Sequence, residues 1–161
     1  MANTRAKLAA LFVALTAALS VSPLARASIS DIARADLDAK AISVIPFDKL
    51  KFEGKPGHAQ SAVVFGDPDG DGQYGIILKW PPHTGSRPHI HLHDRYIIVL
   101  SGTWWVGTGP KYSPDTMVPV KPGEYVTHYA GQIHYDGAKD EPAMIYIVGM
   151  GPQTGFNREE K

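Results

Sequence analysis

Residues Arg87–Arg95 read RPHIHLHDR, and the apolar run Tyr96–Leu100, YIIVL, follows directly. Three histidines, His89, His91 and His93, stand at alternate positions in the first stretch. Successive side chains of an extended strand point to opposite faces, so we expect these three imidazoles to share one face. Neutral imidazole is the commonest metal ligand in proteins. The stretch therefore predicts a β-strand that presents candidate metal ligands.

Short apolar runs separated by turn residues continue on both sides of this stretch. The 161 residues include 16 Gly and 13 Pro, a composition that argues against long helices. The predicted strands are Ala41–Ile45, Ser61–Phe65, Gly75–Trp80, His89–His93, Tyr96–Leu100, Thr103–Gly107, Met117–Val120, Tyr125–His128 and Ala143–Gly149. The segment Tyr135-Asp136-Gly137 is predicted as a turn. Many short strands at this spacing predict an all-β sandwich or barrel in a single domain.

A second segment with histidines, Gly123–His134, reads GEYVTHYAGQIH. Together with the first segment it resembles the two motifs of the cupin superfamily. The first motif contains a His-x-His pair and closes with a Gly, and the second contains two spaced Gly and a His. The matching residues are His89, His91, Gly102, Gly123, Gly131 and His134. The resemblance covers roughly Ser61 to Gly149 and implies a double-stranded β-helix, also described as a jelly-roll barrel.

By this resemblance, His89, His91 and His134 point into the barrel and bind a divalent metal. Nitrogen ligands suit Fe, Zn, Mn, Ni or Cu better than Ca or Mg, which prefer oxygen. Arg95 stands where the first motif has a Glu ligand, and an arginine cannot be deprotonated to act as a ligand. His93 is the expected substitute, since it has the parity to face inward. A site of three histidines completed by water is the alternative, and a metal-free cavity is a further one.

Smaller departures from the motifs are His83 for a Gly, Tyr129 for a Pro and Ala138 for an Asn. These affect loop geometry more than chemistry.

Arg95, Trp104 and Tyr135 are the candidate substrate-binding residues. We expect Arg95 to pair with a nearby acid, Asp94 or Asp136; the alternative is that its planar guanidinium receives a carboxylate of a substrate. Trp104 and Trp105 are adjacent on a strand, so only one of them faces inward, either as core or as a substrate platform. Tyr135 flanks the second motif. It either lines the mouth of the cavity or is an ordinary packing or surface residue with no role in the site.

The N-terminus has the features of a signal peptide. Arg5 and Lys7 precede an uncharged apolar run, Leu8–Val21, and Ala25-Arg26-Ala27 fits a cleavage site. The run is shorter than the roughly 20 residues of a membrane-spanning helix. We therefore predict an exported protein, periplasmic or secreted, with no membrane association after cleavage. The expected organisation is a signal peptide at 1–27, an arm with a first strand at 28–58, the barrel at 59–151 and a tail at 152–161.

Composition limits the partners of the mature chain. Removing Arg5, Lys7 and Arg26 from the 16 Lys and Arg leaves 13 against 16 Asp and Glu, a formal charge of −3. Such a chain offers no basic surface for nucleic acid. The absence of cysteine excludes disulfides and thiolate ligands. The expected partner is a small molecule, and the resemblance also implies a homodimer.

Three functions fit these observations. By the resemblance, an enzyme of this type is a metal-dependent oxygenase acting on a small organic molecule with two adjacent oxygens. The alternative from another class is a non-catalytic module that holds a small ligand or a metal, which the Arg at the Glu position favours. A metal-free isomerase that uses His and Tyr as acid and base is the third.

Overall fold

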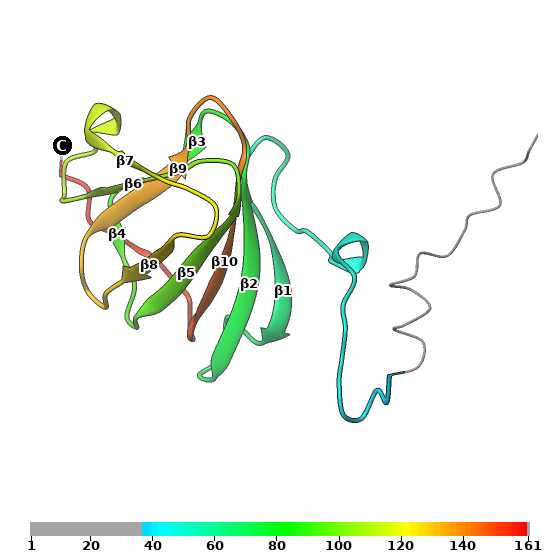
Figure 1. Ribbon diagram of the computed structural model, residues 1–161. Coiled ribbons are helices and arrows are strands. Elements are labelled where there is room, and N and C mark those ends of the chain that lie inside the picture. Colours follow the sequence, from blue (N-terminus) through cyan, green and yellow to red (C-terminus); the bar gives the residue numbers. More distant parts are fainter. Residues whose placement is uncertain (1–36, 161) are drawn as a thin grey trace, which may run out of the picture. The chain divides into compact units, whose positions relative to one another are not determined.

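Two antiparallel β-sheets form in the computed structural model, which describes residues 37–160 (Figure 1). The predicted signal peptide lies outside the described residues, as do residues 28–36 and 161. The first sheet has the order β1-β2-β10-β5-β8, with strands Gln60–Gly66, Gln73–Trp80, Ala143–Met150, Arg95–Ser101 and Tyr125–His128. The second has the order β11-β4-β9-β6-β7, with strands Phe156–Asn157, His89–Ile90, His134–Ala138, Trp104–Thr108 and Val118–Val120. The all-β prediction is confirmed.

The remaining elements are short. Strand β3, Thr84–Gly85, pairs with β9, and the 3-10 turns η1 and η2 span Phe47–Lys49 and Pro114–Thr116. No helix within residues 37–160 is long and apolar enough to cross a membrane.

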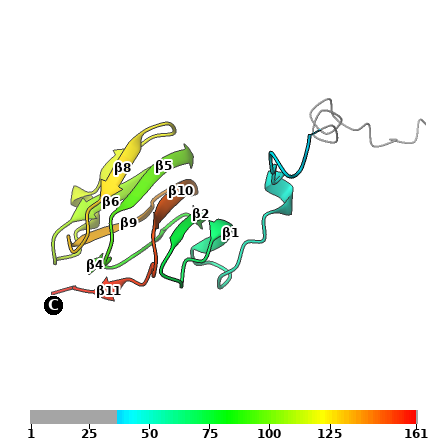
Figure 2. The ribbon, with the colours of Figure 1, turned by 90° about the horizontal axis from the view of Figure 1, so that it is seen from below.

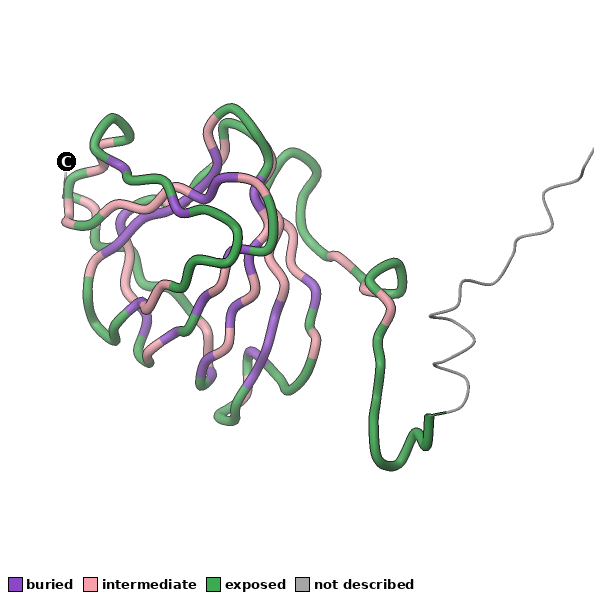
Figure 3. Tube along the Cα trace, viewed as in Figure 1, coloured by how far each residue is buried: buried purple, intermediate pink, exposed green. Residues whose placement is uncertain are grey.

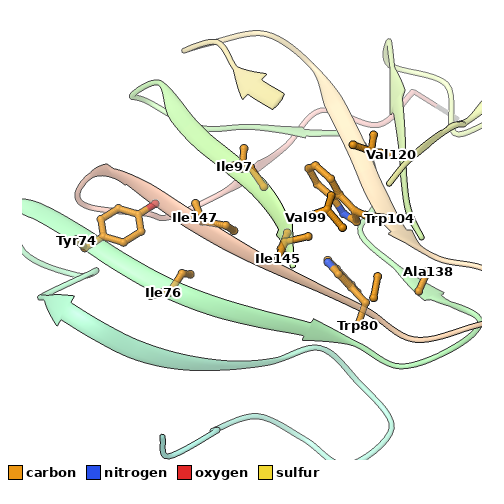
Figure 4. Packing of buried hydrophobic residues seen from close by; sticks show 11 residues of the cluster. Tyr74, Ile76, Trp80, Ile97, Val99, Trp104, Val120, Ala138, Ile145 and Ile147 are labelled. Carbon is orange, nitrogen blue, oxygen red and sulfur yellow. The ribbon is translucent and has the colours of Figure 1, made fainter. Parts of the chain in front are cut away.

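The core lies between the inner faces of the two sheets. Inward and outward positions alternate along the strands, so that Ile97 and Val99 of β5 are buried beside Ile145 and Ile147 of β10. Figure 3 shows this alternation as purple segments along the strands. Trp104 of β6 is fully buried and closes the cluster from the second sheet (Figure 4). Because no disulfide is present, this apolar burial must stabilise the barrel.

Two predicted strands differ from the structure. Residues 41–45 form no strand; the backbone amides of Ala41 and Ile42 instead bond to the carbonyl of Asp38 in a turn. The predicted strand His89–His93 ends after Ile90, because the chain bends at Leu92 and His93 before β5 begins. The expected inward orientation of His93 depended on strand alternation, and the strand ends before His93.

The segment Tyr135-Asp136-Gly137 is a strand and not the predicted turn. It lies in the middle of β9, all five residues of which are buried. Strands β3, β4 and β6 all pair with β9. Turn-forming residues extend here because neighbouring strands satisfy their backbone groups, and such tertiary context overrides local preference.

The C-terminal segment packs on the barrel. Strand β11 pairs with β4, and the amide of Arg158 donates to the carbonyl of Pro88 (Figure 2). Arg87 Nε donates to Glu159 Oε2 at 2.9 Å, which joins the two segments again. Residues 152–160, expected as a tail, therefore form one wall of the structure.

Gly137 marks the closest approach of β9 to β3. A Cβ at this position would lie 2.3 Å from the backbone oxygen of Thr84 and 2.6 Å from Gly85 Cα. We expect Gly137→Ala to lower the free energy of unfolding by about 2 kcal/mol, since backbone atoms must move apart to admit the methyl group. Urea denaturation measures the change. Gly72→Ala is the control, because a Cβ at Gly72 meets no atom within 4 Å; equal losses in the two variants would contradict this account.

Candidate functional site

Three histidines from distant parts of the chain meet inside the barrel. His89 on β4 and His134 on β9 are direct partners in the antiparallel register, which places them side by side although 45 positions separate them. His91 follows directly after β4 and is buried. One ring nitrogen from each histidine lies within 4.8 Å of the other two. His89 Nε2 and His91 Nε2 are 3.1 Å apart.

Backbone carbonyls fix the orientation of all three rings. The Nδ1 atom of His89 lies 2.8 Å from the carbonyl oxygen of Arg87, and that of His91 lies 2.8 Å from the carbonyl of Gln153. His134 Nδ1 lies 3.0 Å from the carbonyl of Gln132. A carbonyl oxygen only accepts, so each Nδ1 carries the proton and each Nε2 carries a lone pair. Such outer hydrogen bonds orient metal-binding histidines in many proteins.

The converging Nε2 atoms fit a transition metal. His134 Nε2 is buried and has no hydrogen-bond partner among the described residues. A buried acceptor without a partner is unfavourable, and a cation bound there would satisfy it. Three neutral nitrogens suit the divalent transition metals of the prediction and leave coordination positions open.

Burial keeps His91 and His134 neutral. It lowers the pKa of His91 to about 3, with a smaller contribution from the charge of Arg95. It also lowers the pKa of His134 to about 4, although the hydrogen bond to the carbonyl of Gln132 acts in the opposite direction. Neutral imidazole is the form that binds metal, so no proton has to leave at neutral pH before an ion can bind.

Arg95 begins β5 beside this cluster, and its guanidinium NH1 donates a hydrogen bond to His91 Nε2. Its side chain is buried, and Nε has no partner among the described residues. The predicted ion pair is wrong, since no carboxylate within residues 37–160 lies at ion-pair distance from Arg95. Asp94 instead accepts the amide of Ala130 at 2.7 Å. Burial lowers the pKa of Arg95, whereas Tyr74 and Asp136 act to raise it.

His128 is a part of the cluster that the sequence analysis left unassigned. It ends β8 opposite Arg95 in the register and is buried. Its ring contacts that of His134 in a tilted arrangement with centroids 3.8 Å apart, and the centroid of the Trp104 ring is 5.5 Å away. Burial lowers its pKa to about 2, with contributions from His134 and Arg95. Alternation along the predicted strand Tyr125–His128 already indicated that the His128 side chain faces inward.

The structure places three predicted site residues away from the cluster or the cavity. His93 is exposed in the bend before β5 and is not among the three histidines whose ring nitrogens lie together. Tyr135 alternates with inward-facing His134 and Asp136, so its ring points to the opposite face, over Gly107. Trp104 is fully buried in the hydrophobic core and does not line the cavity described next.

A cavity of about 350 Å³ adjoins the histidines. Both sheets and the C-terminal segment contribute to its wall. Its lining includes Ile76, Leu78, Trp80, Ser86, His89, His91, Arg95, Asp136, Gln153 and Gly155. Of the predicted substrate-binding residues only Arg95 is among them. Trp80, Ser86 and Asp136 were not predicted, because the pairing that brings them together is not visible in the sequence.

Comparison with known proteins supports the fold. No protein-family model matches the chain, and no curated protein does. The polyketide cyclase RemF from Streptomyces resistomycificus is 20% identical, with a TM-score of 0.61 over 74% of this chain and 87% of that chain. A protein from Klebsiella pneumoniae with a double-stranded β-helix domain is 18% identical, with a TM-score of 0.56 over 73% and 97%. A cupin-2 domain from Rhodospirillum rubrum is 17% identical, with a TM-score of 0.56 over 73% and 81%. These likenesses confirm the predicted double-stranded β-helix.

Proposed function

We propose that this chain, which has the cupin fold, binds a divalent transition metal ion through His89, His91 and His134 and holds a small organic molecule in the adjoining cavity. The convergence of three Nε2 lone pairs, one of them buried without a partner, carries the proposal. An ion held by neutral nitrogens keeps its full positive charge and would act as a Lewis acid on a bound oxygen.

The chain's own residues prepare the site. The carbonyls of Arg87, Gln153 and Gln132 hold the imidazoles in the tautomer that exposes Nε2. Ile76 and Trp80 form an apolar part of the cavity wall, and low polarity there strengthens nearby electrostatic interactions. The likeness to a polyketide cyclase supports an organic substrate.

Metal analysis of the purified protein tests the proposal. The protein is stripped with a chelator, dialysed against Fe²⁺, Zn²⁺, Mn²⁺, Ni²⁺ and Cu²⁺ in turn, and examined by elemental mass spectrometry. We expect one bound ion per chain, and protein without bound metal after dialysis against all five would refute the proposal. Iron in the protein as purified would favour the oxygenase.

The mass of the same protein checks export, since cleavage after Ala27 leaves a chain that begins at Ser28.

A non-catalytic binding module is the second candidate, and the contact of Arg95 with His91 favours it. The guanidinium uses the lone pair that a metal would need, and its positive charge repels a cation. In that case the Nε2 atoms of His89 and His134 serve as hydrogen-bond acceptors for donor groups of a ligand. Ligand binding that is the same with and without chelator, in protein that takes up no metal, would support this candidate over the first.

A further inference from the structure

The cavity beside the histidines contains a cation without an acid partner. Arg95 is 8% exposed, and its Nε has no hydrogen-bond partner among the described residues. The only side-chain hydrogen bond that its guanidinium makes within the described chain goes to His91 Nε2. A buried guanidinium with free donors is unfavourable until an acceptor occupies them. The group that matches its planar fork best is a carboxylate.

A second buried donor lies in the same wall. Trp80 is 8% exposed and lines the cavity, and its indole Nε1–H also has no partner among the described residues. Figure 4 shows the indole projecting from β2 into the space between the sheets. An indole nitrogen only donates, so both unsatisfied groups require an acceptor. Together they favour an anionic ligand group over a cationic one.

The cavity also holds one acid, which restricts the ligand further. Asp136 is 5% exposed, and its Oδ1 accepts a hydrogen bond from Ser86 Oγ at 2.8 Å. Its Oδ2 makes no hydrogen bond within residues 37–160. A ligand that carried only negative charge would be repelled by this carboxylate. A ligand with a hydroxyl group would instead donate to it.

The remaining wall is apolar and limits the size of the ligand. Ile76, Leu78 and Trp80 come from one face of β2. Arg95 and Asp136 are the only charged side chains in the lining of the cavity. A volume of about 350 Å³ is at the lower end of the range for small-molecule sites. It suits a ligand with a single ring or a short branched chain.

We propose that the cavity binds a small hydroxycarboxylate with an apolar body. Its carboxylate accepts hydrogen bonds from Arg95, its hydroxyl donates to Asp136, and its apolar part packs on Ile76 and Leu78. This inference rests on the proposed function in that it uses the same ligand cavity. It requires no contact between the ligand and a metal, so the two can fail separately.

Three related probes test the inference by titration calorimetry. Mandelate carries the carboxylate, the hydroxyl and an aromatic ring; phenylacetate lacks the hydroxyl, and mandelamide lacks the charge. We expect mandelate to bind the wild-type protein at least about tenfold more tightly than mandelamide, and several-fold more tightly than phenylacetate. This comparison needs no variant. Equal affinities for mandelate and mandelamide, or no binding of mandelate, would overturn the inference.

Arg95→Gln tests the assigned cation, and Arg158→Gln is the matched control, because Arg158 is exposed and lies outside the cavity. We expect Arg95→Gln to weaken mandelate by about tenfold or more while leaving mandelamide nearly unchanged, and Arg158→Gln to leave both unchanged. An Arg95→Gln protein that binds mandelate as the wild type does would contradict the inference.

The titrations are run with and without chelator, and metal content is measured in the same samples. If the protein takes up no metal but still prefers mandelate to mandelamide in a way that depends on Arg95, the metal proposal fails and the inference is supported. Bound metal with no preference for the charged probe shows the reverse.

Discussion

Replacing His134 with alanine is expected to abolish stoichiometric metal binding while leaving the barrel folded. His134 supplies one of three ligand atoms, and its Nε2 has no competing partner within the described chain. If the ligands of a four-coordinate zinc site share a binding free energy of about 10–16 kcal/mol equally, losing one costs about 2.5–4 kcal/mol and weakens binding by about seventyfold or more. Elemental analysis after dialysis, together with competition against a coloured chelator, measures the loss.

His93→Ala is the matched control for this experiment. His93 belongs to the same histidine-rich stretch but is exposed and lies outside the cluster. We expect its replacement to leave both the bound metal and the affinity unchanged. Metal retained in His134→Ala, or lost in His93→Ala, would show that the ion binds elsewhere. Circular dichroism of both variants checks that each remains folded.

Lowering the pH is expected to destabilise the metal-free protein steeply between about pH 6.5 and pH 4. The pKa values of His91, His128 and His134 are lowered to about 3, 2 and 4 by burial. In the unfolded chain these groups titrate near 6.5, so below that pH the unfolded state binds more protons than the folded state. The stabilisation is therefore complete above about pH 6.5 and is lost as the pH falls toward the folded-state values.

The size of this effect follows from the same pKa values. At about pH 5 each of the three histidines lowers the free energy of unfolding by about 2 kcal/mol, or about 6 kcal/mol together. Denaturant titrations between about pH 7.5 and pH 5 in the presence of chelator measure it. His128→Gln should reduce the pH dependence by about one proton. An unfolding free energy that is flat over this range would contradict the buried, neutral state of the cluster.

The fold and the main cluster were predictable because their signals are periodic. Apolar runs between turn residues identified β5 and β10 as strands, and the alternate positions of His89 and His91 together with the motif position of His134 marked the cluster. His93 follows the same alternation in the sequence, but its side chain does not follow it in the structure. The strand stops after Ile90, and sequence alternation has no meaning beyond the end of a strand.

The rest of the site depends on pairing between distant strands. Asp136 and Gly137 have the composition of a turn, yet β9 runs between β3, β4 and β6, and only that environment makes it extended. The carbonyl of Gln153, which orients His91, leaves no trace in the sequence, because every residue has a carbonyl. Trp80 is an ordinary strand residue until β2 and the C-terminal segment enclose one cavity.

The placement of the C-terminal segment determines when, during synthesis, the histidine cluster can reach its final arrangement. The carbonyl of Gln153 orients the ring of His91, and a Cβ on Gly155 would lie 3.1 Å from the His89 ring. The ribosome makes this segment after every strand of the barrel except β11. A nascent chain therefore lacks a correctly oriented His91 until residues 153–155 have been added. If the histidines bind an ion as proposed, that ion is expected to be taken up only after this segment has been synthesised and has packed on the barrel.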